Sequence, residues 1–217
     1  MLQLHYYPGN ASLAPHILLE EVGTPFELLM VDRTVSAQKA PTYLALNPNG
    51  LIPVLVDTQT GLVMYEAAAI CLHLCDTHPD AALAPAVGSV QRAHFYKWLM
   101  WLTNTLQASL IQYFYPERWM NAGNAAGAAE LKANVETKVG ELLDLLDAEF
   151  ARHGGPWLLG DNHSAVDAYA MMLCRWTRGF AYPARERTHL APWLARVLER
   201  PAVQRALSTE RTAPPLV

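Results

Sequence analysis

Cysteine is scarce in this chain. Only three of its 217 residues are cysteines, and Cys71, Cys75 and Cys174 all fall within apolar stretches that have helical spacing. Three thiols are too few for a scaffold held by disulfides, and His73 does not share the helix face of Cys71 and Cys75, so a zinc site lacks ligands. We therefore interpret all three cysteines as buried thiols, and we expect no bound metal.

Charge and long hydrophobic runs are scarce as well. Charged residues make up 17% of the chain, the net charge is −4, and the sixteen Lys and Arg residues are scattered, which gives no electrostatic case for binding nucleic acid. The apolar segments are interrupted well short of the roughly twenty residues that span a bilayer, and no signal peptide follows Met1. The sequence therefore predicts a cytoplasmic protein that binds neither nucleic acid nor membranes.

Hydrophobic residues, in contrast, make up 52% of the chain, which is enough for a sizeable core in one large domain or two smaller ones. In the first half, strand and helix patterns follow one another in the order of a thioredoxin-like α/β domain, which we assign to residues 1–79. We expect strands at residues 2–7 and 26–31, a helix from Ser12 that ends at Gly23, a polar loop with a short helical turn at 32–46, a hairpin at 53–65 and a helix from Glu66.

The second half contains only helical patterns. A stretch rich in proline and alanine predicts a linker at residues 80–89, and we assign residues 90–217 to an all-α domain. Helices are expected at residues 91–115, 126–152, 164–179 and 190–198, with a short one from Ala202. Ser164 and Asp167 have the spacing of an N-capping box, in which each side chain pairs with the backbone of the other residue.

Two features of the first domain indicate chemistry. The Ile52–Pro53 bond lies at a loop-to-strand junction, where a cis peptide is tolerated, and such a bond would leave the amide and carbonyl of Ile52 free to pair with an extended peptide. Glu66 lies at a helix start, so its carboxylate and the Ala67 amide would together hold a ligand that carries an ammonium and a carboxylate group. A structural proline and a dipole-stabilising glutamate would explain each residue alone, but together they favour a binding site.

This pattern resembles a known family. A proline at the head of a strand, followed by a hairpin and the helix start at Glu66, is similar to the glutathione-binding half of the glutathione transferases. The capping box supports the resemblance, and so do three segments that place it closest to the bacterial beta class: residues 7–16, Arg175-Trp176 and residues 200–204. The resemblance implies a thioredoxin-like domain followed by an all-α domain, a homodimer, and glutathione as co-substrate without a metal.

The family must raise the thiolate fraction of glutathione, whose thiol has a pKa of about 8.5 and is less than about a tenth ionised at neutral pH. A hydrogen-bond donor to sulfur and the N-terminus of the first helix would lower that pKa by about two units, roughly 2.7 kcal/mol. The beta class has a cysteine where this chain has Ala11, which disfavours mixed-disulfide chemistry. Three candidate catalytic donors remain: Ser12 and Asn10, which we rank level, and Tyr6, which we rank third.

The resemblance also implies which residues bind glutathione. Ile52 and Pro53 are expected to pair with its cysteinyl backbone, and Glu66 with Ala67 to hold its γ-glutamyl end. The remaining candidates are Lys39 or Ser36 for the glycyl carboxylate, and Asn104 in place of an asparagine that the beta class supplies from the partner subunit.

The electrophile is expected to bind between the Pro8–Ser12 loop and the fourth and sixth helices. Four candidate lining residues recur there at three- and four-residue spacing: Trp101, Thr105, Ala108 and Gln112. A helix also buries such a stripe in a core, and if part of it is open, the electrophile is apolar and flat. The sequence thus predicts a glutathione transferase that acts on an apolar electrophile. Two alternatives are a glutathione-dependent peroxidase, disulfide reductase or isomerase, and a non-catalytic binding protein with the glutathione transferase fold.

Overall fold

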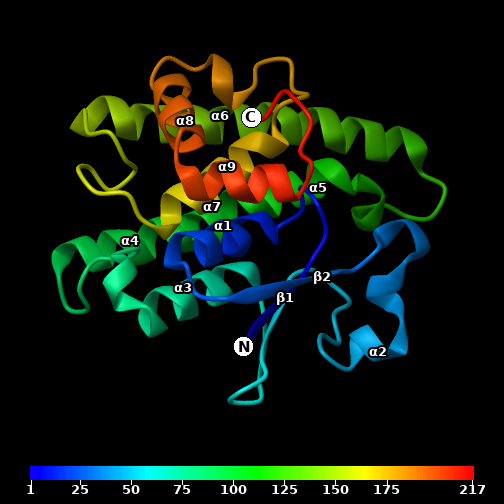
Figure 1. The fold of residues 1–217 in the computed structure, drawn as a ribbon. Helices are drawn as coiled ribbons and strands as arrows, with labels where there is room; N and C mark the ends of the chain where they lie inside the picture. Colours follow the sequence, from blue (N-terminus) through cyan, green and yellow to red (C-terminus); the bar gives the residue numbers. More distant parts are fainter. The chain divides into compact units, whose positions relative to one another are not determined.

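The computed structural model describes all residues from 1 to 217, and the chain folds into two compact units (Figure 1). The first unit contains Met1–Ala84 and Leu198–Pro214, and the second contains Pro85–Val197 and Pro215–Val217. None of the helices combines the length and the hydrophobicity that crossing a membrane requires.

A four-stranded mixed sheet lies in the first unit, with the strands in the order β2-β1-β3-β4. The strands are β1 (Leu2–Tyr6), β2 (Phe26–Met30), β3 (Val54–Asp57) and β4 (Leu62–Tyr65). β1 pairs in parallel with β2 and antiparallel with β3, which pairs antiparallel with β4. Leu4 and Leu55, which face each other across the central pair of strands, are fully buried. The predicted thioredoxin-like fold is confirmed.

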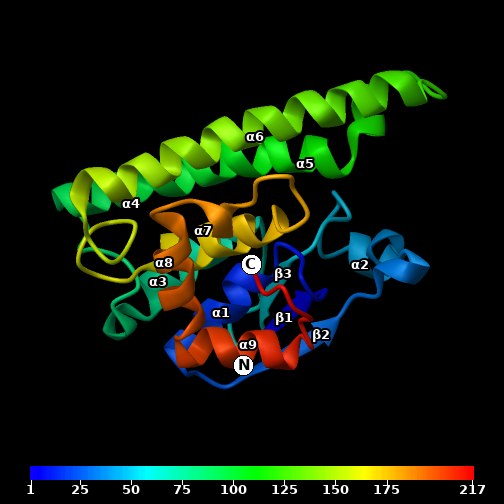
Figure 2. The same cartoon turned by 90° about the horizontal axis from the view of Figure 1, so that it is seen from above.

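Four α-helices belong to this unit: α1 (Leu13–Val22), α2 (Pro41–Leu44), α3 (Ala67–Thr77) and α9 (Pro201–Thr209). Every residue of α1 from Leu13 to Leu19 is buried, because both α3 and α9 pack against this helix. Figures 1 and 2 show α9, in red, beside α1, in blue. A helix with apolar residues on all sides needs partners on all sides, which explains why the last helix returns to the first.

The position of α9 corrects one predicted boundary. We assigned residues 90–217 to a single helical domain, but Leu198–Pro214 packs within the first unit. Arg200 makes a bidentate ion pair with Glu21 at the end of α1, which adds to the apolar packing. The other division between the units, at Ala84–Pro85, lies inside the predicted linker at residues 80–89.

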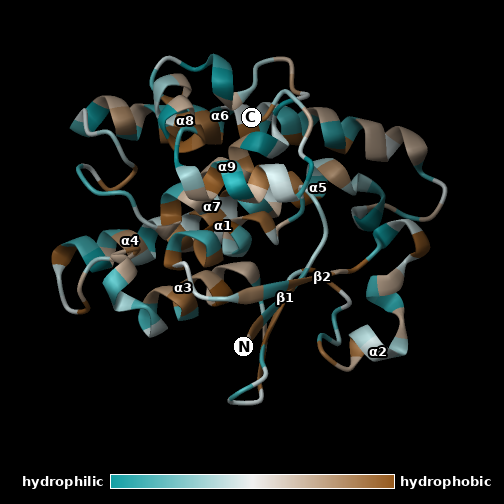
Figure 3. Cartoon of the chain, viewed as in Figure 1, coloured by the Kyte–Doolittle hydropathy of each residue, from teal (hydrophilic) through white to brown (hydrophobic).

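The second unit consists of helices: α4 (Val90–Trp101), α5 (Ala108–Phe114), α6 (Ala125–His153), α7 (Ala165–Trp176) and α8 (Leu190–Leu198). All twelve residues of α7 are buried, so this helix forms the core of the unit. The 29-residue helix α6 packs against α5, and Figure 2 shows it running along both α4 and α5. Hydrophilic and hydrophobic residues alternate along α6 in Figure 3, as expected for a helix that buries one face.

The predicted helix at residues 91–115 is not a continuous α-helix. Its central segment, Leu102–Gln107, is π-helical, a form with i→i+5 hydrogen bonds. Two hydroxyl groups donate to carbonyls of this region: Thr103 Oγ1 to Met100 O, and Ser109 Oγ to Thr105 O. Such bonds compete with the regular ladder, and apolar periodicity does not reveal them.

The predicted capping box at the start of α7 is confirmed. Asp167 is fully buried and accepts hydrogen bonds from the amides of Leu158 and Ser164 and from Trp193 Nε1. Burial raises the pKa of Asp167 to about 6. His163, where a hydrophobic residue is usual, packs its ring edge-on against Trp157 instead.

Candidate functional site

The segment before β3 has an unpaired backbone edge. The Ile52–Pro53 peptide bond is cis, as the sequence led us to expect. The Ile52 side chain packs in a cluster with Val31, Tyr43 and Val54. Neither the amide nor the carbonyl of Ile52 makes a hydrogen bond within the protein, although almost all buried backbone groups in proteins are paired. This short edge is therefore available to an extended peptide.

The residue before Ile52 is held tightly. The Leu51 carbonyl accepts hydrogen bonds from Tyr43 Oη and Asn47 Nδ2, both at 2.8 Å. Both donor side chains are buried, whereas the Leu51 side chain is exposed. Burial also raises the pKa of Tyr43, so its hydroxyl keeps its proton.

Glu66 is the N-cap residue of α3, as predicted, and its backbone is strained. Its φ and ψ angles are 72° and 107°, a conformation that residues other than glycine rarely adopt. Its exposed side chain makes no hydrogen bond or ion pair within the protein and does not cap the helix. The amides of the first turn, beginning with Ala67, are therefore left for an anion, with a free carboxylate beside them.

The loop from Pro8 to Ser12 carries two of the candidate donors, Asn10 and Ser12. The third, Tyr6, lies just before it, at the end of β1. Asn10 ends a tight turn in which its amide donates to Tyr7 O, and its carbonyl accepts from the Leu13 amide at the start of α1. Asn10 Oδ1 accepts from the Ala11 amide. Because the side-chain oxygen is occupied in this way, the Nδ2 hydrogens of this half-buried residue face elsewhere and remain available to donate.

Ser12 differs from Asn10 in both burial and bonding. Its side chain is fully buried, and its hydroxyl donates to Tyr7 O at 3.1 Å and accepts from the Tyr7 amide at 3.3 Å. Ser12 is the N-cap residue of α1, but its side chain makes no capping hydrogen bond. Tyr6, at the end of β1, is half-buried, and its ring lies edge-on to His16 with 6.2 Å between centroids.

A buried glutamate that the sequence analysis missed holds this loop. Glu210 Oε2 accepts from the Gly9 amide at 2.8 Å, and its Oε1 pairs with His16 Nδ1 at 2.8 Å. The side chains of Glu210 and His16 are both fully buried, and His16 Nε2 has no hydrogen-bond partner. Because a carboxylate oxygen can only accept, His16 Nδ1 is the donor in this contact. No sequence pattern reveals a contact between residues about 200 positions apart.

Three polar residues, Arg33, Ser36 and Lys39, lie in the segment between β2 and α2. Lys39 Nζ donates to Asn49 O at 3.2 Å, in the loop that leads to Leu51. Ser36 is exposed and adopts the left-handed conformation, with φ at 57°. Arg33, which the sequence analysis did not select, places its guanidinium carbon 5.8 Å from the centre of the Tyr7 ring. Tyr7 in turn packs against the Ile52 cluster.

The remaining candidates lie on the α4–α5 segment of the helical unit. Asn104 is exposed, and its Oδ1 accepts a hydrogen bond from Thr103 Oγ1. The four residues proposed for the electrophile are not core residues, since Trp101, Thr105 and Gln112 are half-buried and Ala108 is exposed. The buried stripe of this segment consists of Leu102, Leu106 and Leu110 instead.

The cysteines and the possible metal ligands add no further candidate site. All three cysteines are buried and free, as predicted, and burial raises the pKa of Cys71 and that of Cys174, the latter to about 12. No group of three or more His, Cys, Asp or Glu side chains is placed to hold a metal ion.

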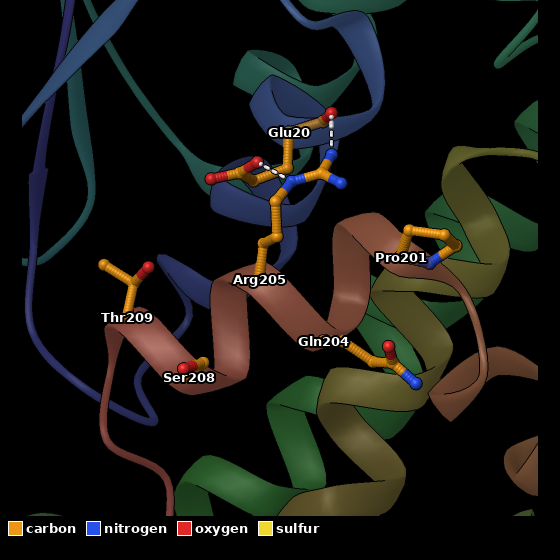
Figure 4. A pocket seen from close by; sticks show the side chains of 6 residues that line it. All are labelled: Glu20, Pro201, Gln204, Arg205, Ser208 and Thr209. Atoms are coloured by element: carbon orange, nitrogen blue, oxygen red, sulfur yellow. Dashed lines mark hydrogen bonds and ion pairs between the residues drawn. The ribbon is translucent and has the colours of Figure 1, made fainter.

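An open depression of about 440 Å³ lies between α1 and α9, and Figure 4 shows the residues that line it. They are Glu20, Pro201, Gln204, Arg205, Ser208 and Thr209. Its one cation, Arg205, donates to the carboxylate and the carbonyl of Glu20. The depression therefore offers no free cation to an anionic ligand.

Comparisons with known proteins support the resemblance. The family model "Glutathione S-transferase, N-terminal domain" matches residues 11–77, and "Glutathione S-transferase, C-terminal domain" matches residues 106–201. The chain is 30% identical over 210 residues to glutathione S-transferase GstA of Escherichia coli O157:H7, with 96% of this chain and 98% of the relative covered.

Two solved structures are also similar. A sphingomonad glutathione S-transferase complexed with glutathione has a TM-score of 0.82 and 31% identity, with 97% of this chain and all of that chain covered. A bacterial beta-class glutathione S-transferase of Sphingomonas chungbukensis has a TM-score of 0.82 and 30% identity, with 99% of this chain and all of that chain covered.

Proposed function

Because the chain belongs to the glutathione S-transferase family, we propose that it activates the thiol of glutathione for attack on an apolar electrophile. The observation that carries this proposal is the unpaired amide and carbonyl of Ile52. An extended tripeptide that adds to this edge through two backbone hydrogen bonds satisfies both groups, which is the usual way in which a strand edge recognises a peptide. The sphingomonad relative was solved with glutathione bound, which supports the choice of ligand.

The α-amino and carboxylate groups of the γ-glutamyl end fit the start of α3. The free carboxylate of Glu66 pairs with the ammonium group, and the Ala67 amide receives the ligand carboxylate at the positive end of the helix dipole. The strained backbone of Glu66 supports a functional role, because such conformations persist mainly where a site needs them.

For the other end of the ligand, Lys39 is our first choice for the glycyl carboxylate, and Ser36 is the second. We call the unpaired backbone of Ile52, together with Pro53 beside it, the docking edge. Asn104 is a candidate to contact glutathione, and the electrophile pocket is assigned to Trp101, Thr105, Ala108 and Gln112.

Asn10 is the donor that the geometry supports best for the sulfur. The hydroxyl proton of Ser12 is already donated to Tyr7 O in a fully buried position, whereas the Nδ2 group of Asn10 is available. Tyr6 stays the third candidate. With this donor and the N-terminus of α1 nearby, the thiol loses its proton to water, and the sulfur electron pair forms a C–S bond with the electrophile. The electrophile then expels a leaving group with its electron pair, or takes up a proton after addition to a double bond.

The test is the variant Asn10→Ala. We expect the pKa of the bound thiol, measured from the ultraviolet absorbance of the thiolate, to rise by about one to two units and kcat/KM near neutral pH to fall about 10- to 100-fold. The control is Asn121→Ala, which removes an exposed asparagine side chain from the helical unit. An unchanged thiol pKa in Asn10→Ala would exclude Asn10 as the activator.

The same assays separate the alternatives. Turnover of a peroxide or a disulfide, with none of chlorodinitrobenzene, would indicate a peroxidase or a reductase, and turnover of an isomerisable substrate alone would indicate an isomerase. Saturable glutathione binding without any thiolate absorbance would indicate a binding protein without catalysis. Ala11 weighs against disulfide chemistry, because no thiol is available there to form a mixed disulfide.

We further propose a homodimer, from the resemblance to the beta class, and a cytoplasmic location, from the sequence prediction. The exposed apolar side chains of Leu51, Val63 and Tyr65 support an interface with another subunit. Sedimentation analysis of the purified chain would test the dimer.

A further inference from the structure

The two hydrogen bonds to the Leu51 carbonyl also determine the direction of the Ile52 N–H, which belongs to the proposed docking edge. The Leu51 carbonyl and the Ile52 amide belong to the same peptide unit, which is planar and trans, so the Ile52 N–H points opposite to the Leu51 C=O. Any group that fixes the direction of this carbonyl therefore fixes the direction of the unpaired N–H. Tyr43 and Asn47 occupy both lone pairs of the carbonyl.

The two donors are themselves fixed. Asn47 Oδ1 accepts from the Asn49 amide at 3.0 Å, so only one orientation of its side-chain amide satisfies both of its contacts. The Asn47 amide donates to Tyr43 O, and the Gly50 amide donates to Asn47 O, which closes a tight turn. The Tyr43 ring is buried in the Ile52 cluster and lies edge-on to His5. The carbonyl thus meets two immobilised donors.

We propose that Tyr43 and Asn47 are positioning residues for glutathione, which they serve by orienting the Ile52 amide toward the ligand. Hydrogen bonds to the carbonyl also polarise the peptide unit and make its N–H a stronger donor. Neither side chain touches the ligand in this proposal. The proposal rests on the proposed function, because it assumes that the Ile52 edge binds the backbone of glutathione.

Two matched substitutions test the proposal. Tyr43→Phe removes only the hydroxyl group. Asn47→Asp keeps an oxygen for the Asn49 amide but replaces the donor to Leu51 with a second acceptor, which the carbonyl repels. We expect the Kd for glutathione to rise about fivefold in each variant and about 20-fold or more in the double variant.

The ligand S-methylglutathione distinguishes positioning from thiol activation, because it keeps the peptide backbone and lacks the thiol. We expect its Kd to rise by the same factor as that of glutathione. KM for glutathione should rise in parallel, while kcat at saturating glutathione and the pKa of the bound thiol stay as in the wild type. The control is Thr77→Val, which removes a different side-chain hydrogen bond to a carbonyl, that of His73, in the same unit.

Each outcome is decisive. If the variants lose stability but bind both ligands within about twofold of the wild type, Tyr43 and Asn47 are merely structural and the proposal is wrong. If the thiol pKa changes instead of the affinity, the two residues act on the sulfur and the proposal is also wrong. If the wild type does not bind glutathione, the proposed function fails first and the positioning role fails with it.

Discussion

The two ends of the proposed glutathione site differ in how far along the sequence their stabilising contacts reach. The Ile52 edge is held by Tyr43 and Asn47, eight and four residues before Leu51 in the sequence. The Pro8–Ser12 loop is held by Glu210, which lies 201 residues after Gly9. The Ile52 edge is therefore a local structure, whereas the loop that carries Asn10, the proposed sulfur donor, depends on a residue at the end of α9. Changes in α9 should affect thiol activation more than glutathione affinity.

The largest effect is expected from Glu210→Ala. This variant removes the acceptor that Glu210 offers to the half-buried Gly9 amide and to the fully buried His16 Nδ1, so we expect the free energy of unfolding in urea to fall by about 2–5 kcal/mol. Under conditions in which the variant is folded, the thiol pKa should rise, while the Kd for glutathione changes less than about threefold. The control is Glu20→Ala, which breaks a more exposed pair with Arg205 between the same two helices and should cost at most about 1 kcal/mol. A variant that loses affinity but keeps the thiol pKa would overturn the comparison.

The capping box of the helical unit is also a local structure, but its Asp167 is fully buried. We therefore expect the stability of the protein to depend on the protonation of Asp167. Burial raises the pKa of Asp167 to about 6, above the value of 3.8 in the unfolded chain, so between these values the folded state binds more protons. The contribution of Asp167 to stability is therefore largest below pH 3.8 and is lost as the pH rises to about 6, a change of about 3 kcal/mol.

The measurement is the free energy of unfolding of wild type and Asp167→Asn at several pH values. The difference, wild type minus variant, should grow as the pH falls from about 6 to 4. A difference that shrinks toward acid would mean that the hydrogen bonds from Leu158, Ser164 and Trp193 outweigh burial.

Glu66→Gly should change stability and glutathione affinity in opposite directions. Glycine adopts positive φ without strain, so we expect the free energy of unfolding to rise by about 1 kcal/mol. Loss of the carboxylate should raise the Kd for glutathione about tenfold. The matched control is Ala82→Gly, at another residue with positive φ, which should gain stability with no change in affinity. Equal affinities in both variants would remove Glu66 from the site.

The smallest effect on activity is expected from Ser12→Ala. The hydroxyl bonds only the Tyr7 backbone, so its loss should lower the free energy of unfolding by about 1 kcal/mol and leave the thiol pKa within a few tenths of a unit. The comparison partner is Asn10→Ala, measured in parallel. If Ser12→Ala raises the thiol pKa as much as Asn10→Ala, the two residues return to equal rank.

Much of the fold and part of the candidate site could be predicted from local patterns. Pro53 before a strand, Glu66 at a helix start, and Ser164 with Asp167 at the spacing of a capping box each constrain the backbone within a few residues. The order of strands and helices follows from the same short-range rules. Motifs spread along the whole chain also identified the family.

Other features of the structure have a different cause. The hydrogen bonds of Ser12 and Glu210, the π-helical segment at Leu102–Gln107 and the place of α9 in the first unit all depend on contacts that no local pattern encodes. The ranking of Asn10 above Ser12 came only from seeing which hydroxyl and amide groups were already paired.

By itself, the sequence determined the fold family and the backbone geometry of the docking edge, because turn, proline and helix-start preferences act over a few bonds. The tertiary structure decided which polar groups remain free to meet a ligand. Burial and hydrogen bonding depend on which segments pack together in space, and the pairing of His16 with Glu210 exists only once the last helix lies against the first.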